Sequence, residues 1–523
     1  MTAQQTYSRL EGLRYSYLDR GRTSSRLTLP YVLPEESFGP HSRLDTPFQS
    51  VGARGVNNLA SKLLLALLPP NAPFFRLQAD TAELAKNGTP EEVLSEIENS
   101  LQRVEDLVMS EIAKEAYRVA LHEALKHLII TGNALLYMPE EGGLRVFNLN
   151  RYVIERDPMG NVLTIATKET ISRKALDPEI HELLETHGAS EENEAMEGDV
   201  NLYTSIRRDD NMWKITQDIN GIVLPKTGGT IPLDRLPYIP LRFSRIDGES
   251  YGRGYVEEYL GDVQSLESLT RAIVEGSAAA AKVLFLVSPN GTTRARTLAD
   301  SPNGAIVQGN AADVTTLQVN KFNDFKVAQM TMDGIKDRLG AAFLLTSGVV
   351  RSAERVTAEE IRMLSQELES SLGGLYSLLS NELQLPLIER LMFVMSKSKK
   401  LPKLPKNLVQ PVIVTGVEAL GRGNDLNKLD QFLAGAAQVV GPQAVSQFVN
   451  VQEYFKRRAT ALGIKTGGLI KSAEQLAQEN QQQMAANMSE KLGPAGIKAL
   501  SDQYKQANSP EQQQLDAAQA QQQ

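Results

Sequence analysis

The segment RVTAEEIRMLSQELESSLGGLYSLLSNEL, residues 355–383, carries the clearest helical pattern in this chain. Thr357 can accept a hydrogen bond from the first turn of a helix, and Glu360 three residues later completes a capping box. Leucine and isoleucine then recur every three or four residues from Ile361 to Leu383. We therefore expect one long amphipathic helix. It should bend at Gly373–Gly374, because each interior glycine costs about 1 kcal/mol relative to alanine.

Two other long helices precede this one. The pattern predicts them at Gly254–Lys282 and Val327–Leu345, the second running into the polar loop Thr346–Arg355. Between them the sequence is rich in Asn, Gly and Pro. It offers two short strand candidates, Ala305–Gln308 and Thr315–Val319.

The first half of the chain changes character near residue 135. Before that point it is mostly helical by pattern, with helices expected at Gln4–Arg20, Leu59–Leu68, Pro90–Ile112 (capped by Thr89, with Glu92 as its box partner) and Tyr117–Ile130. From Ala134 to Phe243 it shows β-branched and aromatic runs, namely LRVFNL, YVIERD, NVLTIAT, MWKITQ and GIVLP. Asp157–Asn161, DPMGN, predicts a hairpin turn. The acidic insert Ala189–Asp199 predicts a solvated loop.

The last part of the chain loses its core-forming pattern. Leu385–Met395 should extend the long helix past Pro386, and a strand is expected at Pro411–Thr415. Two helices are expected at Asp425–Val440 and Val445–Leu462. Glutamine and alanine dominate from Ala473, which favours frayed helix and then disorder.

Three segments of the sequence resemble those of one known protein family. They are GRGYVEEYLGDVQSLESL (252–269), ERVTAEEIRMLSQELESSLGGLYSLLSNELQLPL (354–387) and TGVEALGRGNDLNKL (415–429). Their wording and order are similar to the portal, or head-to-tail connector, proteins of short-tailed phages of the Autographivirus type. The resemblance covers most of residues 1–465.

The resemblance implies an α+β, mainly α, portal fold with wing, stem, clip and crown, assembled as a ring. The divisions expected from it are the wing (1–253), stem helix 1 (254–283), the clip (284–325), stem helix 2 (326–345), the tunnel loop (346–356), the returning wing with the long bent helix (357–424), the crown (425–505) and a disordered Gln-rich tail (506–523).

It also implies a function and a set of partners. The protein would form a homododecameric ring at one capsid vertex of the virion, through which double-stranded DNA is packaged and later ejected. Its partners would be the major capsid protein, a scaffolding protein, the terminase large subunit and a tail adaptor, and internal core proteins are allowed. Assembly would occur in the host cytoplasm, with no cofactor, metal, catalytic residue or membrane.

Several charged side chains are candidates for facing DNA in such a ring. Ring symmetry turns each residue into a circle of charges around one axis. The sets are Arg351, Glu354 and Arg355 in the tunnel loop, Glu258, Asp262, Glu267 and Glu275 on the first stem helix, and Arg294 and Arg296 in the clip. Carboxylate circles would repel phosphates and keep DNA sliding. The basic run Lys397–Lys406 predicts a solvated linker, with a DNA or partner contact as the alternative.

Composition limits the other classes of function. The chain has 523 residues, 41% hydrophobic residues and a net charge of −8, which is typical of a globular protein of two to four domains. It has no cysteine, so disulfides and thiol chemistry are excluded. The first residues do not resemble a signal peptide. The most apolar stretch, Ala272–Val287, contains Glu275 and Lys282 and is shorter than the roughly 20 residues of a membrane span.

Enzyme motifs are incomplete wherever they occur. Gly248–Gly252, GESYG, fits the nucleophile elbow of a hydrolase around Ser250, but no histidine follows His187 to act as base. His122 and His127 are five residues apart, whereas a zinc protease helix needs four. Leu224–Gly229, LPKTGG, lacks the glycine before lysine that a phosphate-binding loop requires.

Two other interpretations stay open at this level. One is a hydrolase using Ser250, and the other is a non-viral helical scaffold or adaptor. The small-residue face Gly276–Ala281 indicates close helix approach. We expect that approach to occur between neighbouring subunits rather than within one.

Overall fold

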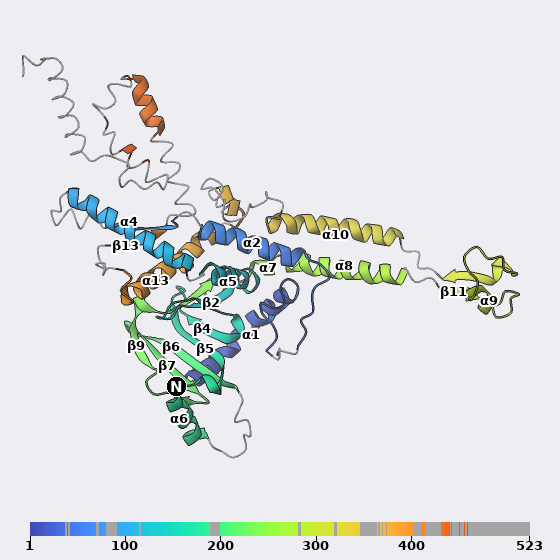
Figure 1. Ribbon diagram of the computed structural model, residues 1–523, viewed down its shortest axis with the longest axis horizontal. Coiled ribbons are helices and arrows are strands. Elements are labelled where there is room, and N and C mark those ends of the chain that lie inside the picture. Colours follow the sequence, from blue (N-terminus) through green and yellow to red (C-terminus); the bar gives the residue numbers. More distant parts are fainter. Residues whose placement is uncertain are drawn as a thin grey trace, which may run out of the picture. The chain divides into compact units, whose positions relative to one another are not determined.

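The computed structural model describes residues 1–36, 39, 42–69, 73–79, 91–114, 117–188, 199–280, 284–317, 322–345, 363–364, 367–368, 370–372, 374–401, 409–413, 430–439, 441, 449, 454–455 and 458 (Figure 1). The chain divides into two compact units, residues 1–421 and 422–523. The described residues form a mixture of helix and sheet in which helix predominates.

The helices of the first unit vary from one turn to about seven. They are α1 (Ala3–Arg26), α2 (Val51–Leu67), α4 (Glu91–Lys114), α5 (Tyr117–Thr131), α6 (Pro178–Gly188), α7 (Tyr255–Glu258), α8 (Leu260–Ala280), α9 (Ala295–Ala299), α10 (Phe322–Ala342), α12 (Leu375–Leu379) and α13 (Leu385–Lys397). A π-helical turn, Ser380–Gln384, joins the last two.

The strands form antiparallel sheets. The largest has the order β4-β5-β6-β7-β8, with β9 also paired to β7. Its strands are β4 (Tyr152–Arg156), β5 (Val162–Ser172), β6 (Asp199–Asp209), β7 (Met212–Ile219), β8 (Ile222–Val223) and β9 (Gly229–Pro232). Smaller sheets pair β1 (Phe75–Ala79) with β13 (Val409–Ile413), β2 (Asn133–Tyr137) with β3 (Arg145–Phe147) and β10 (Tyr238–Arg242), and β11 (Leu284–Val287) with β12 (Val314–Leu317).

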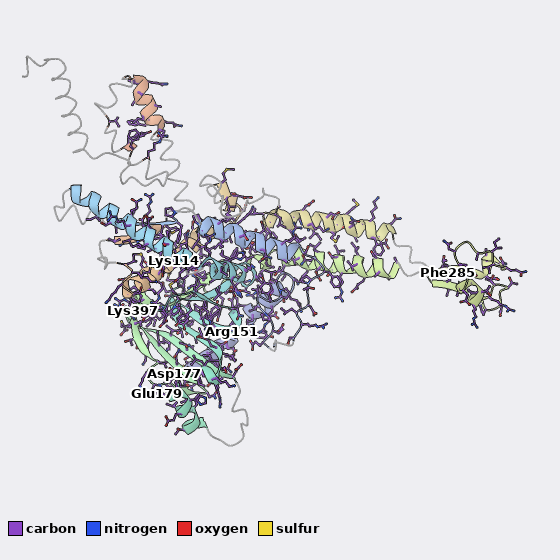
Figure 2. All side chains as sticks on the ribbon, viewed as in Figure 1. Lys114, Arg151, Asp177, Glu179, Phe285 and Lys397 are labelled. Atoms are coloured by element: carbon purple, nitrogen blue, oxygen red, sulfur yellow. The ribbon has the colours of Figure 1, made fainter. Side chains whose placement is uncertain are left out.

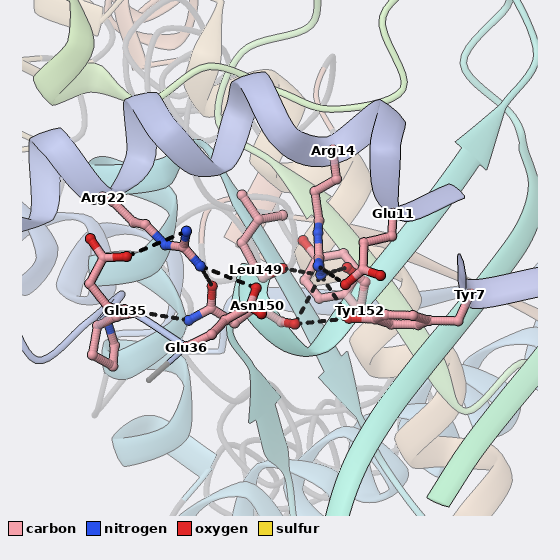
Figure 3. A network of polar contacts seen from close by, with 10 residues as sticks. Tyr7, Glu11, Arg14, Arg22, Glu35, Glu36, Leu149, Asn150 and Tyr152 are labelled. Carbon is pink, nitrogen blue, oxygen red and sulfur yellow. Dashed lines mark hydrogen bonds and ion pairs between the residues drawn. The ribbon is translucent and has the colours of Figure 1, made fainter. Parts of the chain in front are cut away.

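Helix α1 packs on the six-stranded sheet through one fully buried arginine (Figure 3). The Arg14 guanidinium donates to the Leu149, Asn150 and Tyr152 carbonyls at 2.8–2.9 Å. It also donates to the Tyr7 hydroxyl at 3.0 Å and lies over that ring. Burial raises the pKa of Tyr7 to about 12. This network fixes the N-terminal helix against strand β4, since a buried cation must keep its acceptors.

The largest core lies where the helices of the first unit meet two strands of a smaller sheet. It joins the apolar faces of α2, α4 and α5 to β2 and β10 and to the α12–α13 helix. Val56, Leu59, Leu63 and Leu128 in it are fully buried. Helix α2 is central to this core.

The helix predictions before residue 346 are confirmed in position and differ at the ends. Helix α1 continues six residues past Arg20, and α2 begins at Val51 rather than Leu59. The first stem helix is interrupted at Tyr259 into α7 and α8. The second begins at Phe322, five residues before the predicted start. A turn also separates the residues before Gly374 from α12, as the glycine pair predicts.

Two predictions in the strands need correction. Ala305–Gln308 is not a strand, since residues 305–308 follow a turn closed by the Ala305 N–H and the Pro302 carbonyl and join no sheet, and the first strand of that sheet is β11 instead. In the six-stranded sheet, strand β6 was not predicted, although it forms a long pairing with β5. Its sequence ends in charged residues, Arg207–Asp209, which interrupt the alternating pattern. The DPMGN turn is confirmed, with Gly160 at φ 88° and Asp157 N–H bonded to the Asn161 carbonyl at 2.9 Å.

Some predictions lie outside the described residues. They are the capping box at Thr357 and Glu360, the tunnel loop, the acidic insert at 189–198, most of Val445–Leu462 and the Gln-rich tail. In the second unit, residues 430–439 are helical, within the predicted helix Asp425–Val440. There the Tyr454 hydroxyl donates to Asp430 at 2.6 Å, and Arg458 pairs with the same carboxylate at 3.3 Å.

Candidate functional site

Helices α8 and α10 form an antiparallel pair (Figure 1). Asp262 near the start of α8 pairs with Arg338 near the end of α10 at 2.7 Å. At the other end, a side chain on Gly276 would lie 2.8 Å from the Phe325 ring, so glycine permits this contact. The close approach expected at Gly276 is therefore made within one chain, while Ser277, Ala278 and Ala279 stay exposed.

Most of the surface of this helix pair is open in the single chain. Helix α8 buries only Val263 and Leu266 among its 21 residues. Apolar side chains on the outer faces are exposed, with Val274 at 50%, Val327 at 64% and Met330 at 68%. Long helices this poorly buried are stabilised by tertiary or quaternary packing rather than by propensity.

The four candidate acids on the first stem helix have different surroundings. Asp262 is engaged by Arg338, and this hydrogen bond holds the pKa of Asp262 below its usual range. Glu267 accepts the backbone N–H groups of Phe48 and Gln49 at 3.0 and 3.1 Å, just before α2. Glu275 pairs with Arg271 one turn earlier at 2.9 Å.

Glu258 is the remaining acid and lies at the base of the pair. It lines a cavity of about 410 Å³ together with Tyr255, Tyr259 and Leu375. Partial burial, with Glu257 adding a like charge, raises the pKa of Glu258. The residue as a whole is nevertheless exposed in the single chain.

The segment between the two stem helices is a two-stranded sheet with a short helix. Arg294 is the residue before α9, and Arg296 lies inside it, 96% exposed and 3.8 Å from Asp300. Asp313 organises the loop, because it accepts the Thr293 N–H and the Thr292 hydroxyl, both at 3.1 Å. These bonds lower the pKa of Asp313.

Apolar side chains on this segment face solvent. Phe285, labelled on β11 in Figure 2, is 62% exposed, Leu286 is 52% exposed and Ile306 is fully exposed. The tunnel-loop candidates Arg351, Glu354 and Arg355 lie outside the described residues.

The GESYG motif is a packing junction. The Ser250 hydroxyl accepts the Arg156 N–H at 3.2 Å, and no histidine contacts it among the described side chains. Asn133 holds Gly252 with two hydrogen bonds of 2.8 Å. A Cβ on Gly252 would lie 2.7 Å from the Gly132 carbonyl oxygen, so the glycine is required for chain crossing at the start of the stem.

The histidines singled out as possible metal ligands make contacts with neighbouring side chains instead. His122 contacts Ser61 at 3.3 Å, and His127 lies 3.9 Å from Glu123. No cluster of three possible metal ligands occurs among the described residues. Nor is any helix among them long and apolar enough to cross a bilayer.

The site includes residues that the sequence analysis did not select. Asn58 and Lys62 of α2 contact the end of α10, and Arg338 pairs with Asp262. A weak signal for the first two existed, since they are polar, four residues apart on one helix face and set in the leucine-rich run VNNLASKLLLALL.

Comparison with known proteins gives consistent matches. The family model described as bacteriophage head to tail connecting protein matches residues 1–470. The chain is 40% identical over 527 residues to the portal protein of Enterobacteria phage T3, covering 99% of this chain and 97% of that protein. It is 40% identical over 498 residues to the portal protein of Escherichia phage T7, covering 94% and 91%.

Solved structures give a weaker likeness. The neck of an empty GTA particle computed with C6 symmetry aligns over 80% of this chain and 90% of that chain. The TM-score is 0.39 at 10% identity, which is too low to support an inference.

Proposed function

This chain belongs to the bacteriophage head to tail connecting protein family, and from that premise we propose that it forms the ring-shaped portal at one capsid vertex, through which double-stranded DNA enters and leaves. Members of the family are structural proteins of the virion and not enzymes. The proposed assembly is a dodecamer with wing, stem, clip and crown, divided at the residues given above.

The open surface of the stem supports the ring. Only two of the 21 residues of α8 are buried in one chain, and Val274, Val327 and Met330 project from the pair. In a ring, neighbouring copies of the same pair would cover these faces. The Asp262–Arg338 contact keeps the two helices of each copy together.

The channel side would carry the acidic candidates. We place Glu258, Asp262, Glu267 and Glu275 towards the DNA, where circles of carboxylates would repel phosphates. Asp262 and Glu275 have arginine partners within the chain, and Glu267 is held by backbone N–H groups. Glu258 forms no ion pair with any residue that the structure describes, and it should therefore contribute most of the repulsion.

The other docking roles are those that the family resemblance implies. Arg351, Glu354 and Arg355 would touch DNA from the tunnel loop. Arg294 and Arg296, with exposed Phe285 and Leu286 beside them, would offer the clip first to the terminase large subunit and then to a tail adaptor. The major capsid protein and a scaffolding protein would contact the wing, and internal core proteins the crown side.

Electron microscopy of the purified full-length protein tests this function directly. Rings with an open centre and a radial wing are expected. A monomer or dimer at every protein concentration tested would contradict it.

Charge reversal tests the channel surface. Glu258→Lys is expected to slow DNA packaging in a defined packaging reaction, because it adds a circle of positive charge beside the phosphates. Glu179→Lys, the same reversal at an exposed residue of α6, is the matched control and should leave the packaging rate unchanged. Equal packaging rates for Glu258→Lys and wild type would show that Glu258 does not face the DNA.

A further inference from the structure

The end of stem helix α10 is capped by side chains from other elements. The last carbonyls of any helix lack helical partners. Here three successive ones each accept a side-chain donor, namely Ala342 O from Tyr255 at 2.9 Å, Phe343 O from Asn58 at 3.0 Å, and Leu344 O from Asn58 at 3.0 Å and Lys62 at 3.2 Å. A cation is favourable at this negative end of the helix.

The fit between α2 and this helix end is tight. A Cβ on Gly55 would lie 2.6 Å from the Phe343 ring, so the ring sits directly on the α2 backbone. Leu344 then adopts a positive φ of 54°, which turns the chain away from the helix. Because a non-glycine residue rarely adopts this conformation, the surrounding contacts must hold it.

Lys62 also reaches a second segment of the chain. Its ammonium lies 3.5 Å from the Glu367 carboxylate, while Lys62 itself is 2% exposed. Glu367 follows residues 346–362 in sequence, and Leu344 precedes them. One buried cation therefore contacts the chain on both sides of the segment that carries Arg351, Glu354 and Arg355.

We propose that Lys62 is a positioning residue that holds the end of α10 and the segment around Glu367 at a fixed separation. It thereby sets the two points from which residues 346–362 start and finish. The consequence for DNA transport rests on the portal function proposed above, whereas the bridge itself does not. Asn58 acts on the first of the two points alone.

The Lys62 charge is expected to fix the relative positions of the two segments and to contribute little to the free energy of folding. The Glu367 side chain is 31% exposed, so water can solvate it when Lys62 is replaced, and the Leu344 carbonyl keeps its hydrogen bond from Asn58. Lys62→Met, with a side chain of similar shape, is therefore expected to fold and to assemble as wild type does. Its effect should be confined to the two contacted segments.

Hydrogen exchange of the full-length protein without DNA tests the bridge. Lys62→Met should speed exchange about tenfold in peptides covering both 340–345 and 367–372, as expected for loss of a hydrogen bond from a charged donor. Asn58→Leu should affect only the first peptide, and Glu367→Gln only the second. Lys336→Met, which removes an exposed lysine on α10 paired with Asp333, is the control and should change neither.

The double variant separates a bridge from two unrelated effects. Lys62→Met combined with Glu367→Gln should exchange at 367–372 no faster than Lys62→Met alone, because both changes remove the same contact. Additive rates, or faster exchange at one peptide only in Lys62→Met, would overturn the proposal.

Packaging supplies the functional readout. Lys62→Met rings should package DNA several-fold more slowly than Lys336→Met rings of the same assembly state. Equal rates together with faster exchange at both peptides would overturn the positioning role for DNA transport. Failure of wild type to form rings would instead count against the portal function, and the exchange result would still decide the bridge.

Discussion

Replacing Arg14 with methionine is expected to loosen helix α1 from the six-stranded sheet (Figure 3). The side chain is fully buried and donates from one guanidinium nitrogen to three backbone carbonyls and to Tyr7. That nitrogen carries two hydrogens, so at most two of these bonds are strong at any moment. Methionine would fill much of the volume, but the Leu149 and Tyr152 carbonyls would lose their bond from Arg14, while the Asn150 carbonyl would keep its bond from the Tyr7 hydroxyl.

The size of the effect follows from these contacts. Each hydrogen bond from a charged donor contributes about 1.5–3 kcal/mol, and two of them give about 3–5 kcal/mol after some relaxation. At about 1.4 kcal/mol per factor of ten, α1 should open roughly a hundred to a few thousand times more often. Glu11 adds little, because its side chain is 43% exposed.

Native-state hydrogen exchange is the suitable assay. A protein of several units does not unfold in a single two-state step, whereas local opening of one helix has a defined free energy. Amides in α1 should lose protection by the factor above in Arg14→Met. The control is Arg9→Met on the same helix, where an exposed pair with Glu155 should cost less than about 1 kcal/mol. Equal protection in the two variants would refute the reasoning.

Other outcomes can be checked with simpler measurements. Gly132→Ala should abolish soluble expression, because φ at Gly132 is 75° and the new Cβ would lie 2.3 Å from the Arg253 carbonyl carbon. Gly12→Ala is the control: its Cβ would meet no atom within 4 Å, so the better helix former should raise the melting temperature slightly. Asp262→Asn should lower the melting temperature at neutral pH by an amount worth less than about 1 kcal/mol. The direction of the pH dependence follows from the lowered pKa of Asp262 in the folded protein. The pair with Arg338 stabilises the fold fully above the pKa of an unfolded aspartate, about 3.9, and this stabilisation is lost as the pH falls through the folded-state pKa. The melting temperatures of Asp262→Asn and wild type should therefore converge in acid. A constant difference across that range would exclude the pair as the cause.

Local sequence patterns were sufficient to locate the main helices. The three-and-four spacing of apolar residues placed α1, α5, α8 and α10, and the DPMGN turn placed the hairpin between β4 and β5. These features depend on residues within about two turns of one another. Helix ends were less accurate, because α1 extends past its apolar pattern and α2 begins before it.

The roles of single polar side chains depended on contacts between distant parts of the chain. Glu267 and Glu275 occupy similar positions on one amphipathic helix, yet one binds the backbone before α2 and the other pairs with a neighbour on its own helix. Nothing in their local sequence distinguishes the two.

The sequence alone therefore determined the family, the order of the helices and the absence of a complete catalytic motif. It did so because these depend on residue identity and on short-range periodicity. Only the tertiary structure decided that Asn58 and Lys62 cap a helix end 285 and 282 residues away, respectively, and that Asp262 faces Arg338. Such pairs form where the burial of large apolar surfaces brings two distant helices together. The residues next to each partner do not encode that position, beyond the presence of a polar side chain among apolar ones.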